Sequence, residues 1–160
     1  MKGIIEQLDD YSKWKKANDV FTSQHYIGAV CNFSHIVAIS RLIFPEIVII
    51  SDCFFLKDSR QKANIKELWE NAITISDLEK MVNFICISNL TNLEAEKNNE
   101  ILNEKIAIFL KDMWQYYLEM IHKDKKIEIQ IYNDMYDGWC ITVYQKDKLK
   151  HPKPDILPEW

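Results

Sequence analysis

The sequence predicts an α+β fold, with about five helices, a short central strand segment and a C-terminal β-hairpin that forms a small antiparallel sheet. Apolar residues recur at three- and four-residue steps through several long segments, which is typical of amphipathic helices. The densest apolar run, residues 42–56, contains the β-branched stretch Ile47–Ile50, which favours a strand. Residues 127–132 and 139–144 alternate apolar and polar side chains around Asp137-Gly138, which indicates a hairpin.

Five segments have the helical pattern: residues 4–18, 24–43, 60–72, 77–90 and 100–122. The second is apolar on more than one side, so we expect a central helix that is covered on several faces. It should end before Pro45, because a proline pushes the residue before it toward extended geometry. Ser76 and Glu79 have the spacing of a capping box, which predicts the start of the fourth helix.

The apolar run 42–56 is expected to be the folding centre, either as a strand pair or as one bent strand. Ser51 and Asp52 interrupt it and predict a tight turn or a bulge. The length is that of one domain, residues 1–150, followed by a proline-containing polar tail, residues 151–160. Ile156, Leu157 and Trp160 could dock this tail on a surface groove.

Composition excludes several classes of function. The net charge of -4 and the presence of only two arginines argue against nucleic-acid binding, which depends on a basic surface. The three glycines are too far apart for a phosphate-binding loop or a dinucleotide fingerprint. The longest apolar runs fall short of the roughly 18 residues of a membrane span. We therefore expect neither a nucleic acid nor a membrane as a partner.

The N-terminal sequence lacks the pattern of a signal peptide, which predicts a cytoplasmic protein. The four cysteines, Cys31, Cys53, Cys86 and Cys140, are widely spaced in apolar surroundings, so reduced and buried thiols are expected. The histidines and cysteines lack the spacing of a metal site, and neither a metal nor another cofactor is expected.

Two groups of residues are candidates for function. The first is an aromatic and acidic cluster at the final hairpin turn, a composition typical of protein interfaces. It consists of Tyr132, Asp134, Tyr136, Asp137 and Trp139. The second is a possible acid–base pair, Glu46 and Asp52, beside the central strand. For Glu46 a cap or a buried hydrogen bond is favoured over catalysis, and for Asp52 a turn.

The motif from Leu42 through Phe44-Pro45-Glu46 to Asp52-Cys53 and Leu56 resembles one in a group of small uncharacterised bacterial cytosolic proteins. Trp69, the stretch 79–83 and the strand end 142–145 resemble later elements of that group. Histidines that follow the Met-x-Asn stretch there are replaced here by Phe84 and Cys86, so a site built on them is not expected. By general type, small acidic proteins of this kind are similar to immunity proteins that neutralise bacterial toxins.

The sequence therefore predicts a non-enzymatic cytosolic binding protein, an immunity protein that occludes the active site of a toxin nuclease. Asp134 and Asp137 would meet basic groups of the partner, while Tyr136 and Trp139 would fill apolar pockets. The alternative is a small enzyme or ligand-binding protein that uses Glu46 and Asp52. The oligomeric state has no signature in the sequence.

Overall fold

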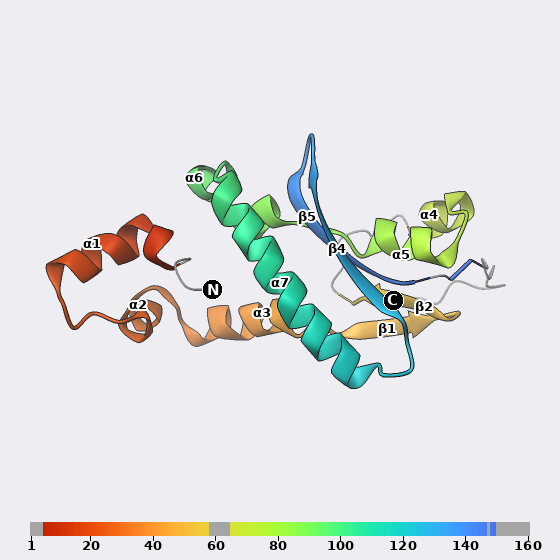
Figure 1. Ribbon diagram of the computed structural model, residues 1–160, viewed down its shortest axis with the longest axis horizontal. Coiled ribbons are helices and arrows are strands. Elements are labelled where there is room, and N and C mark those ends of the chain that lie inside the picture. The colour runs from red at the N-terminus through yellow and green to blue at the C-terminus, as the bar shows by residue number, and fades with distance from the viewer. Residues whose placement is uncertain (1–4, 58–64, 147, 150–160) are drawn as a thin grey trace. The chain divides into compact units, whose positions relative to one another are not determined.

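The computed structural model of the chain describes residues 5–57, 65–146 and 148–149 (Figure 1). The chain divides into two compact units, Met1–Leu42 and Ile43–Trp160. Helices and small antiparallel sheets are both present, so the α+β prediction is confirmed. The predicted tail, residues 151–160, lies outside the described residues, as does the predicted start of the third helix.

The first unit is helical. It contains a 3-10 turn, Ile5–Gln7, and the helices α1 (Asp9–Ala17), α2 (Ser23–Val30) and α3 (Phe33–Ile43), the last ending at the start of the second unit. Four aromatic side chains from α1, α2 and their connection pack with ring centroids 5.5–5.9 Å apart: Tyr11, Trp14, Phe21 and Tyr26. These rings supply the unit's core, since Tyr11 is its buried residue among those described.

The single helix predicted for residues 24–43 is wrong, because the chain breaks into α2 and α3 at Cys31 and Asn32. The side-chain oxygen of Asn32 accepts a hydrogen bond from the His35 amide at 3.0 Å and so starts a new helix. No described residue of α2 or α3 is buried, contrary to the expectation of a covered helix. Within the described residues, no single helix has the length and hydropathy to cross a membrane, although α2 and α3 together do, bent by 112° at their break.

The second unit contains two antiparallel sheets. Strands β1 (Ile47–Ile50) and β2 (Cys53–Leu56) form one, as a hairpin with a two-residue turn. The other has the order β3-β5-β4, from β3 (Ile85–Cys86), β4 (Ile127–Asp134) and β5 (Gly138–Gln145). The β4–β5 hairpin was predicted, and the β1–β2 hairpin is the strand pair that was one of the two alternatives for residues 42–56. The two-residue strand β3 was not predicted.

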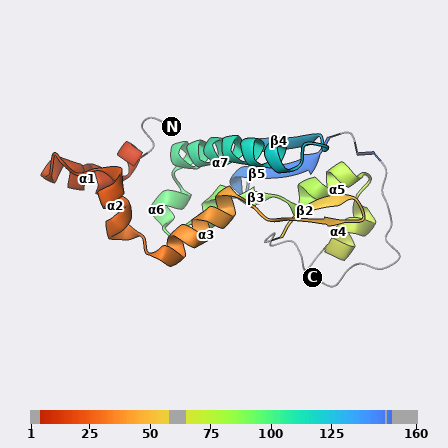
Figure 2. The same ribbon diagram turned by 90° about the horizontal axis from the view of Figure 1, so that it is seen from below.

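Helices cover both faces of the larger sheet. The unit contains α4 (Ile65–Asn71), α5 (Ile75–Val82), a 3-10 turn Ile87–Leu90, α6 (Glu94–Lys97) and α7 (Glu100–Ile121). The sheet lies between α7 on one side and α5 on the other (Figure 2). Fully buried side chains fill the α7 side, among them Leu110, Trp114, Leu118, Ile141 and Val143. A second apolar cluster joins β2 to α4 and α5, with Cys53, Phe55, Trp69, Leu78 and Val82.

Two buried polar side chains of α5 join the two sheets. The Glu79 carboxylate accepts hydrogen bonds from the Phe54 amide at 2.7 Å and the Gln145 amide at 2.6 Å. One turn later, Asn83 accepts from the Leu56 amide at 2.8 Å and donates to the carbonyl oxygens of Phe54 (2.7 Å) and Val143 (2.9 Å). These side chains take the place of a neighbouring strand along the free edges of β2 and β5, where unpaired backbone groups would be costly.

The same bonds show that the predicted capping box of Ser76 and Glu79 is wrong. Helix α5 begins two residues earlier, with Thr74 as the N-cap, whose hydroxyl accepts a hydrogen bond from the Asp77 amide at 3.0 Å. Ser76 donates instead to the Gln145 carbonyl at 2.6 Å. The local spacing was right for a cap, but both side chains have partners distant in sequence.

Candidate functional site

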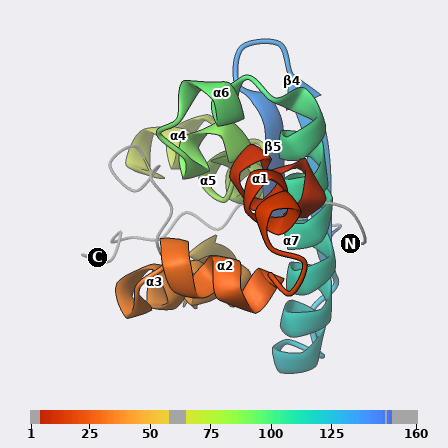
Figure 3. The same cartoon turned by 90° about the vertical axis from the view of Figure 1, so that its left-hand side faces the viewer.

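The turn between β4 and β5 projects beyond the helices of its unit (Figures 1 and 3). Met135 and Tyr136 at this turn are 84% and 88% exposed. The Asp134 carboxylate accepts hydrogen bonds from the amides of Tyr136 at 2.8 Å and Asp137 at 3.0 Å. Gly138 closes the turn with φ +68°, a conformation that glycine adopts without strain. The turn is therefore held by its own residues, and its large side chains remain in solvent.

A cleft of about 420 Å³ begins at this turn and runs along one face of the hairpin. Its floor comes from β4 and β5, its wall from α4, α5 and Phe84 in the segment after α5, and its outer rim from the turn. The lining residues are Leu68, Lys80, Met81, Phe84, Gln130, Tyr132, Asp134, Asp137, Cys140 and Thr142. The wall is thus mainly apolar, while the rim is acidic.

The structure brings four of the five predicted hairpin residues to one surface. Tyr132, Asp134 and Asp137 line the cleft, and Tyr136 lies at its rim. Trp139 is separate, because it pairs with Asn133 whereas Tyr132 pairs with Cys140, and successive strand residues point to opposite faces. Half-buried Trp139 therefore faces the α7 side of the sheet, together with Ile141.

The rim of the cleft carries uncompensated negative charge. Neither Asp134 nor Asp137 takes part in a salt bridge with a described residue. The one cation of the lining, Lys80, lies 4.3 Å from the centre of the Tyr144 ring and interacts with Glu128, away from the rim. The positive charge of Lys80 therefore interacts with Tyr144 and Glu128 rather than with the acidic rim.

The pKa values of nearby groups follow from this environment. The two donated amides lower the pKa of Asp134, which keeps its carboxylate ionised. Burial first, then the charges of neighbours that include Asp134 and Asp137, raises the pKa of Tyr132 to about 12. The rim is therefore a place where a cation is favoured.

The other candidate pair, Glu46 and Asp52, is not brought together. Glu46 precedes β1 and forms an exposed salt bridge with Lys57 at 2.6 Å. Asp52 lies in the β1–β2 turn, at the opposite end of the hairpin, with φ 66°, so its predicted turn role is confirmed. Lys148 lies 2.6 Å and Lys125 3.6 Å from its carboxylate, and the hydrogen bond from Lys148 is the main reason why the pKa of Asp52 is lowered.

Several residues of the cleft were missed from the sequence. Leu68, Met81 and Phe84 come from other elements, and only the tertiary fold shows that they meet the hairpin. Among the residues that the structure describes, no group of three or more histidine, cysteine or acidic side chains could hold a metal ion.

Comparison with known proteins gives no relative: no family model, no curated protein and no solved structure matches the chain.

Proposed function

We propose that the chain is a non-enzymatic binding protein whose β4–β5 turn and adjoining cleft receive a basic protein surface. The single observation that supports this most is the exposure of Met135 and Tyr136 on a turn that is already ordered. Large exposed side chains are otherwise costly to solubility, and aromatic residues of this kind are typical anchors of interfaces.

The turn's internal hydrogen bonds favour tight binding. Because the Asp134 carboxylate fixes the amides of Tyr136 and Asp137, little conformational entropy remains to be lost on association. Ser88 adds a hydrogen bond to the Asp137 carbonyl at 3.5 Å, which ties the turn to the segment after α5. Preorganised contacts of this kind raise the affinity for a partner without adding to the area buried in the interface.

Charge complementarity supports a basic partner. The cleft has apolar walls and an acidic rim, which suits an arginine or lysine side chain with its long apolar stem. The active sites of nucleases are rich in such cations because they bind phosphates. We infer that the partner is a toxin nuclease and that the chain acts as its immunity protein, the rim carboxylates occupying the place of phosphate.

The positions of Glu46 and Asp52 do not favour the alternative that the chain is an enzyme. A catalytic pair must reach the same bound substrate, but Glu46 and Asp52 lie at opposite ends of a hairpin whose strands have four residues each. Both carboxylates also form salt bridges with lysines, Glu46 with Lys57 and Asp52 with Lys148.

A growth-rescue assay tests the proposal. The chain is co-expressed with the nuclease domain encoded by a neighbouring gene, and survival is scored. Wild type should rescue growth, whereas the double variant Met135→Ser with Tyr136→Ser should not. The matched control, Tyr116→Ser with Met120→Ser, changes the same residue types at exposed positions of α7 and should rescue fully. Rescue by the turn variant equal to that by wild type would contradict the proposal.

A further inference from the structure

Cys86 and Cys140 lie directly opposite each other on β3 and β5. Both are free thiols, they are 6% and 1% exposed, and they share a side-chain hydrogen bond. The proposed function assigns no role to either thiol, although Cys140 lines the cleft. The remaining cysteines lie elsewhere, Cys31 in the first unit and Cys53 in β2, so this juxtaposition is specific to one pair.

The strand register gives this pair the geometry of a cross-strand disulfide. The backbone groups of Val143 and Gln145 point toward α5, away from β4, so those of Ile141 point the same way, toward β3. Cys140 is offset by one residue, which makes Cys86–Cys140 a non-hydrogen-bonded pair. The Cα atoms of such pairs are about 4.5 Å apart, within the range of roughly 4.4–6.8 Å that disulfides require.

We propose that Cys86 and Cys140 form an oxidisable dithiol that a low-molecular-weight disulfide, such as oxidised glutathione, converts into a cross-strand disulfide. The Cys140 thiolate attacks one sulfur of glutathione disulfide and releases the first glutathione thiolate, which takes up a proton. Cys86, as its thiolate, then attacks the Cys140 sulfur of the mixed disulfide and releases the second glutathione. Two protein thiols are oxidised and one glutathione disulfide is reduced to two thiols.

Glutathione disulfide can approach Cys140 from the cleft that this residue lines, although Cys140 is 1% exposed and Cys86, which does not line the cleft, is 6% exposed. The reaction is slow at neutral pH, since burial first, and then Cys86, Asp137 and Asp134, raise the pKa of Cys140 to about 12. Tyr132 and Lys80 are the other titratable side chains that line the cleft beside Cys140 apart from the rim carboxylates, and Lys80 is held at the ring of Tyr144. Because the pKa of Cys140 is high, the rate of disulfide formation should rise about tenfold per pH unit, in step with the thiolate fraction.

The disulfide would have a local consequence. It would fix β3 to β5 just before the 3-10 turn whose Ser88 donates to the Asp137 carbonyl. The edge of the cleft would thereby be fastened to the hairpin. This inference does not depend on the proposed partner and can be tested on the purified chain alone.

The test is intact-mass spectrometry of the native chain after incubation with oxidised glutathione at mildly alkaline pH. In wild type, Cys86 and Cys140 should together lose two hydrogen atoms and retain no adduct, and proteolytic mapping should link the peptides that contain them. Cys31→Ser should behave as wild type. Cys86→Ser should stop at one retained glutathione on Cys140. The oxidised chain should unfold at a higher urea concentration, because the cross-link restricts the unfolded state.

Three results would overturn the proposal. The first is a native wild-type chain that keeps both thiols or retains a glutathione adduct on Cys86 or Cys140. The second is a disulfide that involves Cys31 or Cys53. The third is a link between Cys86 and Cys140 that forms only after the chain is unfolded by urea.

Discussion

The β1–β2 and β4–β5 hairpins of the second unit are both antiparallel pairs, but their turns have different supports. Ser51 and Asp52 in the β1–β2 turn both have positive φ, 48° and 66°, although neither is glycine, which costs about 1–2 kcal/mol for each residue. Tertiary contacts offset that cost: Lys148 binds the Asp52 carboxylate at 2.6 Å and Gln145 donates to the Asp52 carbonyl at 2.8 Å.

The β4–β5 turn is supported mainly from within. Asp134 supplies two hydrogen bonds and Gly138 supplies the positive φ, and Ser88 adds one hydrogen bond from outside the hairpin, to the Asp137 carbonyl at 3.5 Å. The first hairpin is consequently part of the core, with every residue of β2 buried, and the second can present Met135 and Tyr136 to a partner. A turn held by its own residues is the one that remains available for binding.

The largest effect should come from breaking the support of the first hairpin. Asn83→Ala would leave the Leu56 amide and the carbonyl oxygens of Phe54 and Val143 without their present partner. We expect a loss of about 3–5 kcal/mol in the free energy of unfolding. Urea denaturation measures it. Asn71→Ala, which removes an exposed bond to the Glu67 carbonyl, is the control and should cost less than about 0.5 kcal/mol.

A smaller effect is that the contribution of Glu79 to the free energy of unfolding depends on pH. Burial raises the pKa of Glu79 above its ordinary value of 4.5, against the opposing bonds from Gln145 and Phe54. Its contribution to stability is therefore complete below pH 4.5 and is lost as pH rises through the folded-state pKa. The stability difference between wild type and Glu79→Gln should fall as pH increases. Urea midpoints of both proteins give this difference, and one that grows with pH would contradict the account.

The next effect on stability should come from a change in the backbone of the β4–β5 turn. Gly138→Ala places a Cβ in open space but retains φ +68°, so only backbone strain of about 1–2 kcal/mol is expected. Gly28→Ala in α2 is the matched control, since open space also surrounds its Cβ and alanine favours helix. Thermal unfolding should show the first variant less stable and the second unchanged or more stable. A neutral Gly138→Ala would show that the turn is not fixed as described.

The smallest effect on stability should come from the exposed side chains themselves. Met135→Ser with Tyr136→Ser removes almost no buried area, so the free energy of unfolding should change by less than about 0.5 kcal/mol. Urea denaturation checks this. A larger loss would mean that these side chains support the fold.

Much of this contrast could be predicted from local pattern. Alternation identified β4 and β5, the β-branched run identified β1, and Ser51-Asp52 was correctly predicted as a turn. Glu79 and Asn83 could not be predicted, because their partners lie in β2 and β5, far away in sequence, and local spacing suggested a cap. The break at Asn32 was hidden by the apolar pattern on both sides of it.

The candidate site was predicted only in part, because local pattern shows the turn but not the contacts between distant segments. The turn residues form a continuous stretch, so their composition alone indicated an interface. Trp139 was grouped with them although strand alternation places it on the opposite face from Tyr132. The apolar wall of the cleft, formed by Leu68, Met81 and Phe84, depends on the position of α4 and α5 relative to the sheet.

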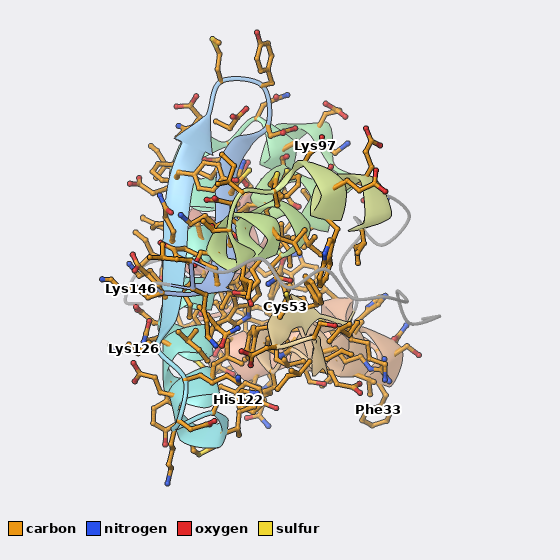
Figure 4. The ribbon with its side chains drawn as sticks, turned by 90° about the vertical axis from the view of Figure 1, so that its right-hand side faces the viewer. Phe33, Cys53, Lys97, His122, Lys126 and Lys146 are labelled. Carbon is orange, nitrogen blue, oxygen red and sulfur yellow. The ribbon has the colours of Figure 1, made fainter. Side chains whose placement is uncertain are left out.

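The basic and acidic ends of the second hairpin lie apart. Lys126 and Lys146 lie side by side at its open end, where the Lys146 amide donates to the Lys126 carbonyl at 2.7 Å (Figure 4). The acidic turn is at the other end. Lys146 also forms a salt bridge with Glu128 at 3.4 Å. For the basic partner that we propose, the acidic turn would be the end of the hairpin that is attracted first.

The affinity of the purified chain for a candidate toxin nuclease, the class of partner that we propose, tests the central claim most directly when it is measured by titration calorimetry. The account predicts that Met135→Ser with Tyr136→Ser raises the dissociation constant at least about thirtyfold, since one anchor residue contributes roughly 2 kcal/mol. Tyr116→Ser with Met120→Ser should leave it within about threefold of wild type. An unchanged dissociation constant for the turn variant, in a chain that binds the nuclease, would contradict the claim that this turn is the binding site.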